Sequence, residues 1–212
     1  MAHLGTGRTV IYWTSPLIIL LAFAAYGVLH SVLASSAVKE WARRRFGEDL
    51  VFRTYRLVFN LIGVVTLFPI VFLALWLPDL RLYTVPRELE YVFFLGQALG
   101  ILFIVTSYGL TDVLDFLGFR QLVNIDRSPK LAIEGIYRYL RHPLYTGSML
   151  VLWLIPSMTL NWMALILGAS LYFIIGARYE ERKLEEFYGK AYRDYKARTP
   201  MFIPWPRKPR EG

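Results

Sequence analysis

Residues 143–177 read PLYTGSMLVLWLIPSMTLNWMALILGASLYFIIGA, and no charged side chain occurs in these 35 positions. A helix needs about 20 apolar residues to cross the hydrocarbon core of a bilayer. The stretch is therefore too long for one span and has enough residues for two short ones. We expect a helical hairpin here, with its turn near Asn161.

Three more uncharged stretches are long enough to cross a membrane as helices, at residues 16–34, 57–77 and 91–110. Together with the hairpin they predict five transmembrane helices in an all-α integral membrane protein. The composition agrees, because 56% of the residues are hydrophobic, whereas soluble domains usually contain about 45 to 50%.

The basic residues predict the orientation of the chain. Outside the five expected spans, alternate compartments hold 21 and 3 of the 24 lysine and arginine residues. Cytoplasmic loops carry the excess of positive charge, so we expect the N-terminus outside and the C-terminal helix in the cytoplasm. If residues 143–177 formed a single span, the ten basic residues of the tail would lie outside, which the same rule disfavours.

The overall charge and the missing cysteines exclude several kinds of partner. A formal charge of +8 could suit nucleic acid, but uncharged stretches divide the basic residues into blocks rather than one stripe, so no nucleic-acid partner is expected. The absence of cysteine excludes thiolate nucleophiles and cysteine-containing metal sites. With three histidines in the whole chain, we expect no metal site.

The segment 35–56 combines six basic residues with Trp41, Phe46 and Phe52. This mixture is typical of a surface helix that rests on anionic lipid. Solvated anchoring beside the membrane is the simpler interpretation of the same pattern. Membrane lipids, in particular anionic ones, are therefore expected partners.

The segment 134–147, EGIYRYLRHPLYTG, leads into the fourth expected span. Proline suits the first turn of a helix, so Pro143 predicts that His142 lies at the N-cap. The free N–H groups and the positive dipole end of such a helix attract an anion. Alternatively, Arg138 and Arg141 only anchor the helix at the interface.

A second polar segment, RYEERKL at residues 178–184, follows the fifth expected span. Glu180 and Glu181 follow the apolar span closely and so lie near the hydrocarbon core of the membrane. A carboxylate there is energetically costly unless it has a partner. Since the two spans form a hairpin, both polar segments emerge on the same side and could bind one ligand between them. The alternative is an ion-pair network that joins the two glutamates to Arg178 or Arg141.

These residues resemble a known family. RHPLY at 141–145, the uncharged hairpin and EERKLEEFYGKAYRDYKARTPMFIP at 180–204 are similar to the isoprenylcysteine carboxyl methyltransferase and phospholipid methyltransferase superfamily. DFLGFRQL, IPSMT and ARYEERKL are most similar to its bacterial branch of methanethiol S-methyltransferases and NnrU-like proteins. The bacterial branch implies a prokaryotic inner membrane, and the distribution of basic residues predicts that the active site faces the cytoplasm.

The resemblance implies one membrane domain over residues 1–212, made of a three-helix part, 1–110, and a cofactor-binding catalytic part, 111–205. It also implies S-adenosylmethionine as cofactor. The implied contacts are Pro129, Lys130, Leu131, Ala132, Tyr137, His142, Pro143, Leu144, Tyr145 and Glu180.

Two positions depart from the family pattern. Many relatives have a histidine where this chain has Pro129, which a backbone contact would tolerate. The prenylcysteine enzymes carry a substrate-binding arginine four residues before the position of Glu180, and here that residue is Gly176. Arg178 lies about 200° around the helix from Gly176 and is no simple replacement.

Methylation of a small or lipid-soluble thiol is the favoured reaction. A free thiol has a pKa of about 8.5 and needs a base or a positive environment, for which His30, Arg120 and Arg178 are the candidates. A phospholipid amine or an isoprenylcysteine carboxylate is the alternative acceptor. A non-catalytic NnrU-like accessory protein and a simple lipid-surface anchor are the alternatives to an enzyme. The sequence leaves the oligomeric state open.

Overall fold

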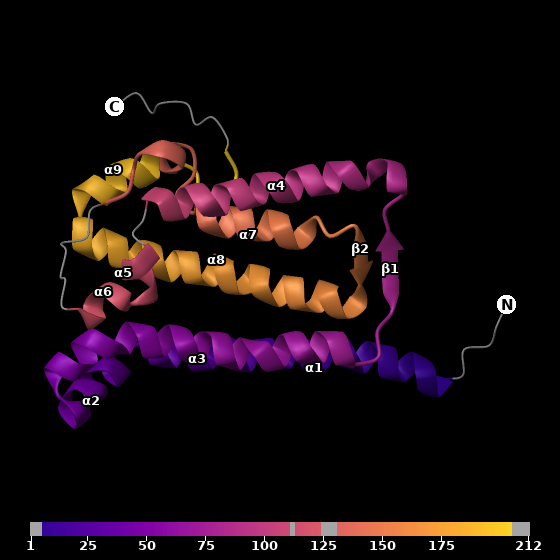
Figure 1. Ribbon diagram of the computed structural model, residues 1–212, viewed down its shortest axis with the longest axis horizontal. Coiled ribbons are helices and arrows are strands. Elements are labelled where there is room, and N and C mark those ends of the chain that lie inside the picture. The colour runs from indigo at the N-terminus through magenta and orange to yellow at the C-terminus, as the bar shows by residue number, and fades with distance from the viewer. Residues whose placement is uncertain (1–5, 111–112, 124–130, 205–212) are drawn as a thin grey trace. The chain divides into compact units, whose positions relative to one another are not determined.

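The computed structural model describes residues 6–110, 113–123 and 131–204 (Figure 1). Helices dominate the described part of the chain, and two short strands complete it. The helices are α1 Thr6–Ala34, α2 Ser36–Phe46, α3 Glu48–Trp76, α4 Arg87–Leu110, α5 Val113–Leu117, α6 Phe119–Leu122, the 3-10 helix η1 Gly135–Arg138, α7 Pro143–Trp153, α8 Leu160–Tyr188 and α9 Lys190–Arg198, and the strands are β1 Arg81–Thr84 and β2 Ser157–Thr159.

Within the described residues, four helices are long and apolar enough to cross a membrane, over Tyr12–Ala34, Glu48–Trp76, Arg87–Gly109 and Leu160–Tyr188. They confirm a helical integral membrane protein. The helix α7 is not among them, because its 11 residues extend about 16 Å, roughly half of the 30 Å hydrocarbon core.

The chain forms two compact units that interleave along the sequence. The first unit comprises Met1–Thr84, Leu114–Arg127 and Ser157–Ala169, and the second comprises Val85–Val113, Ser128–Pro156 and Ser170–Gly212. The division falls inside α8, which continues without a break from Leu160 to Tyr188.

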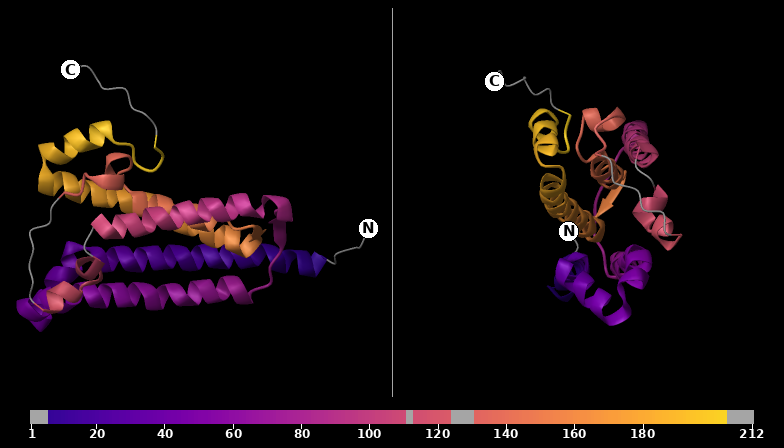
Figure 2. Two further views of the ribbon diagram at one scale, coloured as in Figure 1. Left: turned by 45° about the horizontal axis from the view of Figure 1, so that its top comes forward. Right: turned by 90° about the vertical axis from the view of Figure 1, so that its left-hand side faces the viewer.

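In the first unit α1 and α3 run side by side, as both views of Figure 2 show. Gly118 holds the α5–α6 turn against the start of α3. Its φ of +97° favours glycine, and a Cβ there would lie 2.7 Å from the backbone nitrogen of Leu57. Polar bonds hold the same contact, since Arg56 Nη1 lies 2.8 Å from Asp115 Oδ2 and Asn60 Nδ2 donates to Leu117 O at 3.1 Å.

The two strands join the α3–α4 connection to the α7–α8 connection in the first unit. They pair antiparallel, with Tyr83 opposite Met158. The fully buried Asn161 completes the turn: its N–H donates to Asp79 Oδ1 at 2.9 Å and its Nδ2 to Leu77 O at 3.2 Å. The expected turn near Asn161 is therefore present, and it is built partly as a β-ladder that the helical periodicity did not predict.

In the second unit α7 packs on α4 through a contact between two glycines. A Cβ on Gly147 would lie 2.5 Å from the carbonyl oxygen of Gly100, and a Cβ on Gly100 would lie 2.7 Å from that of Gly147. Small residues let two membrane helices approach this closely. Gln97 Nε2 donates to Val151 O at 3.1 Å. The glycine contact and this hydrogen bond together hold α7 against α4.

Candidate active site

The predicted polar segments meet in the second unit, at the first turn of α7 and the last turns of α8. His142 is the N-cap of α7 and the buried Pro143 is its first helical residue, as the sequence predicted. The next helix, α9, follows α8 after Gly189, whose φ is +57°. The segment 199–202 then passes along the start of α7.

Glu181 lies at the centre of a buried charged cluster, which we call the Glu181 cluster. Its Oε1 atom is 2.7 Å from Arg141 Nε and 3.2 Å from His142 Nε2, and its Oε2 atom is 3.0 Å from Lys196 Nζ. The side chains of Arg141 and Glu181 are each 5% exposed. The alternative interpretation, an ion-pair network, is therefore correct for Glu181 and Arg141.

Arg141 also holds the end of α9. Its Nη1 atom donates to the carbonyl oxygen of Lys196 at 3.2 Å and to that of Thr199. A guanidinium offers five donors in a fixed plane, so one side chain can bind a carboxylate and two carbonyls together. Glu185 accepts from Lys196 Nζ and raises the pKa of that ammonium, so Lys196 stays charged.

The segment 199–202 bonds to the backbone at the start of α7. The N–H of Arg141 donates to Pro200 O at 3.0 Å and that of His142 to Met201 O at 3.2 Å. Thr146 Oγ1 donates to Phe202 O at 2.9 Å. An extended segment was expected after Pro200, but its place beside His142 became visible only in the fold.

A side-chain hydrogen bond also connects α9 to η1. Tyr195 is buried, and its hydroxyl donates to the carbonyl oxygen of Tyr137 at 2.7 Å. Burial raises the pKa of the Tyr195 hydroxyl, so the group keeps its proton and its role as donor. The backbone of Tyr137 is thus held at the edge of the site.

Glu180 has different surroundings from its neighbour. Its side chain is 50% exposed, and its Oε2 atom accepts from the Tyr145 hydroxyl at 3.2 Å. His142 Nδ1 lies 3.7 Å from the same oxygen. The ring of Tyr145 stacks between His142 and Phe173, with centroids 5.5 and 5.3 Å away. An accessible carboxylate beside aromatic faces is suited to an organic cation.

The remaining predicted residues are distributed as follows. Leu131, Ala132 and Leu144 are partly buried in the second unit, and Arg178 is exposed on α8. Pro129 and Lys130 lie outside the described residues. His30 and Arg120 belong to the first unit, where the His30 ring stacks on Tyr26 at a centroid distance of 5.6 Å and lies tilted against Phe59 at 4.2 Å.

Sequence reasoning missed Phe173, Lys196, Thr199 and Phe202 as parts of the site. Phe173 precedes Glu180 by seven residues, two helical turns, so helical spacing would have placed both on one face of α8. Lys196 and Thr199 follow Arg141 by 55 and 58 residues. No local pattern indicates such a contact.

The chain is similar in sequence to known methyltransferases. Residues 91–191 match the family model described as phospholipid methyltransferase. The methanethiol S-methyltransferase of Pseudomonas deceptionensis is 29% identical over 205 residues, which cover 91% of this chain and 74% of that protein. The enzyme of the same name from Mycobacterium tuberculosis is 27% identical over 194 residues, 89% of this chain and 78% of the relative.

A more distant relative is protein-S-isoprenylcysteine O-methyltransferase B of Arabidopsis thaliana, 33% identical over 94 residues that cover 41% of this chain and 47% of the plant protein. No solved structure matches the chain. The family resemblance predicted from the sequence is confirmed. The relatives support a methyltransferase enzyme, and the long apolar helices indicate an integral membrane protein.

Proposed function

We propose that this methyltransferase takes its methyl group from S-adenosylmethionine and transfers it to a small or lipid-soluble thiol. The observation that carries the proposal is the half-exposed Glu180 carboxylate, framed by Tyr145 and His142. The relatives named methanethiol S-methyltransferase, which align with most of this chain, support a thiol as the first choice of acceptor.

The described residues fit the charged end of S-adenosylmethionine. Glu180 would bind the ammonium group, and the N-terminus of α7 beside His142 would bind the carboxylate. The aromatic faces of Tyr145 and Phe173, stacked 5.3 Å apart, would lie near the positive sulfonium or the adenine. The bound cofactor supplies an activated methyl group, so the protein has mainly to align the reactants and exclude water.

Further cofactor contacts are proposed along the segment that precedes α7. Tyr137, held through its carbonyl oxygen by Tyr195, would face the cofactor with its ring. Leu131, Ala132, Pro143 and Leu144 complete the proposed contacts in the described part, and Pro129 and Lys130 extend them beyond it.

A thiol acceptor loses its proton when the new carbon–sulfur bond forms. His30 is the candidate for accepting that proton, and Arg120 and Arg178 are candidates for stabilising the thiolate. For a carboxylate acceptor the chain lacks the arginine of the prenylcysteine enzymes. Its place is taken by Gly176, where a Cβ would meet no described atom within 4 Å. This disfavours an isoprenylcysteine carboxylate, and a phospholipid amine is the second candidate acceptor.

We further propose that α7 and the residues after it form a fifth crossing. The helix extends about 16 Å, and the three residues 154–156, if extended, add about 10 Å before β2 begins, which together approach the thickness of the hydrocarbon core. The pairing of β2 with β1 supports this crossing, because it puts the α7–α8 turn and the α3–α4 connection on the same side of the membrane. The site then lies on the opposite side, the cytoplasmic one by charge, in a prokaryotic inner membrane.

A single membrane domain over residues 1–212 is part of the proposal. The uninterrupted α8, which contributes to both units, supports it. The NnrU-like accessory is the competing function, and the methyltransferase names of the relatives favour the enzyme.

The proposed function is tested by a cofactor titration followed by an acceptor screen. The purified protein in detergent is titrated with S-adenosylmethionine, then incubated with it and either a small alkyl thiol, an amine phospholipid or a prenylcysteine. We expect saturable binding and release of the demethylated cofactor with the thiol alone. Binding without turnover on any acceptor would favour the accessory protein, and turnover on the amine lipid alone would replace the thiol.

A further inference from the structure

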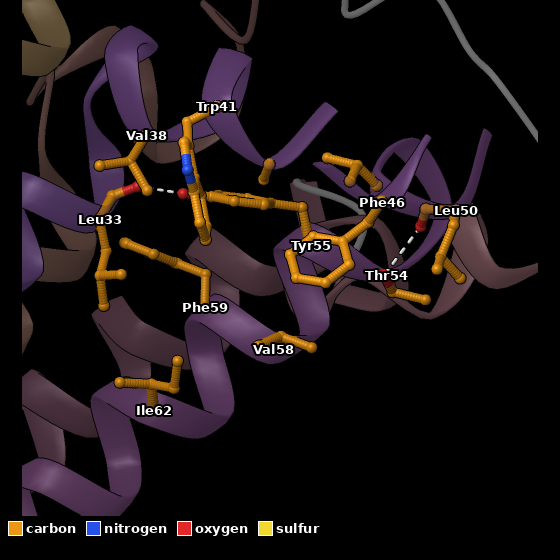
Figure 3. A pocket seen from close by; sticks show the side chains of 12 residues that line it. Leu33, Val38, Trp41, Phe46, Leu50, Thr54, Tyr55, Val58, Phe59 and Ile62 are labelled. Carbon is orange, nitrogen blue, oxygen red and sulfur yellow. Dashed lines mark hydrogen bonds between the residues drawn. The ribbon is translucent and has the colours of Figure 1, made fainter. Parts of the chain in front are cut away.

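A second site lies in the first unit, where the end of α1, the helix α2 and the first turns of α3 enclose an apolar pocket (Figure 3). Its cavity measures about 260 Å³. Leu33, Val38, Trp41, Phe46, Val58 and Phe59 provide most of its wall in the view. The cavity is slightly smaller than the usual range of small-molecule sites, about 300 to 1,000 Å³, and its lining consists mostly of hydrocarbon and aromatic rings.

The two hydroxyl groups of the wall are directed to the backbone rather than to the pocket. Thr54 Oγ1 donates to Leu50 O at 2.8 Å, and the Tyr55 hydroxyl donates to Leu33 O. Both bonds are drawn in Figure 3. A polar ligand would lose its hydration here without finding these partners, so the pocket selects an apolar group.

The helix α2, which provides part of the pocket wall, is basic, and we call its Lys39 and Arg43 the basic rim. The helix α2 carries Lys39, Arg43, Arg44 and Arg45 against one acidic residue, Glu40. Glu40 pairs with Arg44 at 2.9 Å, which leaves three positive charges in excess on this helix. Lys39 and Arg43 also line a neighbouring depression on α2.

Lys39 connects this charge to the apolar pocket. Its Nζ atom lies 5.9 Å from the centroid of the Tyr55 ring, and Tyr55 lines the pocket. The acidic residues at the start of α3 oppose the charge only in part, because Asp49 pairs with Arg53 at 3.2 Å. An anionic group is therefore favoured next to an apolar cavity.

The pocket lies where a membrane surface is expected. The helices α1 and α3 are candidate spans, and α2 connects them. Trp41 and Phe46 are 60% and 55% exposed beside the cavity, which is usual for aromatic residues at the headgroup level.

We propose that this pocket binds one acyl chain of an anionic phospholipid, whose phosphate lies at Lys39 and Arg43. An uncharged apolar ligand would use the cavity but not the basic rim. A lipid that only surrounds the protein would use the charge but not the cavity. The anionic phospholipid uses both, and its binding does not depend on the proposed methyl transfer.

Fluorescence quenching tests the occupant. The full chain is reconstituted in zwitterionic vesicles that contain a few per cent of phospholipid with brominated acyl chains, carrying either a phosphatidylglycerol or a phosphatidylcholine head group. The signal of Trp41 is obtained as the difference between the wild type and Trp41→Phe. We expect saturable quenching by the anionic lipid at mole fractions where the zwitterionic lipid has little effect. Equal quenching by both lipids would overturn the proposal.

Variants separate the rim from the cavity. Lys39→Gln and Arg43→Gln should each lower the affinity for the anionic lipid about fivefold, which is the effect expected for one basic residue at a membrane surface. Arg44→Gln is the matched control on the same helix, because its charge is already paired with Glu40, and it should change little. Ala42→Leu fills the cavity from the buried lining residue Ala42 and should reduce quenching by the anionic lipid. An equal loss in all three charge variants would indicate general attraction to the membrane and reject the site.

Discussion

At the scale of single residues, the two adjacent glutamates at the end of α8 have separate tasks. Glu181 is 4% exposed and bonded to three cationic or polar side chains, whereas the side chain of Glu180 is half-exposed. Neighbouring residues of a helix point about 100° apart, so one turns toward α9 and the other toward Tyr145. The first is a structural group and the second is available to a ligand.

Glu180→Gln should lower the affinity for S-adenosylmethionine about ten- to a hundredfold, because it removes a charge-assisted bond worth roughly 1.5 to 3 kcal/mol. The thermal midpoint without cofactor should stay unchanged, since the side chain is half-exposed. Isothermal titration of both proteins measures the difference. Unaltered affinity would remove Glu180 from the cofactor site.

Glu181→Gln should instead destabilise the fold without cofactor. Breaking a buried ion pair leaves an uncompensated charge on Arg141 and typically costs about 3 to 5 kcal/mol. Thermal unfolding in detergent should show a clear drop in the midpoint. The control is Glu186→Gln, an exposed position on the same helix, which should behave like the wild type. A stable Glu181→Gln protein would contradict the structural role of the Glu181 cluster.

At the scale of the elements, the position of the site depends on how closely α7 approaches α4. The glycine pair Gly100 and Gly147 leaves no room for a Cβ at either position. The first turn of α7, with His142 at its N-cap, is therefore positioned by a contact farther along the same helix.

Gly147→Ala should push α7 away from α4 and lower both stability and cofactor affinity. Overpacking of this kind typically costs about 1 to 3 kcal/mol. Gly109→Ala on α4 is the matched control, because a Cβ there meets no described atom within 4 Å and alanine favours helix over glycine by about 1 kcal/mol. Thermal midpoint and titration are measured on both variants. Equal behaviour of the two would show that the glycine contact does not hold the site.

At the scale of the whole molecule, the distribution of charge and the β1–β2 pairing support the same orientation. Both connections joined by the ladder are poor in basic residues, with Arg81 and Arg87 the two within residues 78–90. Of the other 22 lysine and arginine residues, the basic loops and the tail hold 21 and the N-terminus holds one. By the positive-inside rule we expect the ladder outside and the proposed site in the cytoplasm.

Reporter fusions measure this orientation directly. A reporter fused after Gly212 should be active in the cytoplasm, and one inserted near Arg81 should be active outside. A further reporter in the 154–159 connection should agree with the one near Arg81, because β2 pairs with β1. An external C-terminal reporter would contradict the fifth crossing.

The sequence by itself determined the class of fold and indicated the two segments that form the candidate site. Membrane insertion depends on the apolar content of a continuous run, which is why the helical membrane class and the turn near Asn161 were predictable. Capping is equally local, so Pro143 and His142 indicated the start of α7 before the fold was known.

Only the tertiary structure decided which glutamate is buried and what completes the site. Arg141 and Glu181 are 40 residues apart in the chain, and Arg141 reaches Thr199 across 58. Contacts of this separation depend on how α8, α9 and the segment 199–202 pack together, and no periodicity within one helix encodes that packing. The helix α7 ends at Trp153, earlier than a helix reaching the turn near Asn161 would. Hydropathy did not predict this end, because an apolar residue has the same hydropathy in a helix and in a strand. The strand β2 forms only by pairing with residues more than 70 positions away.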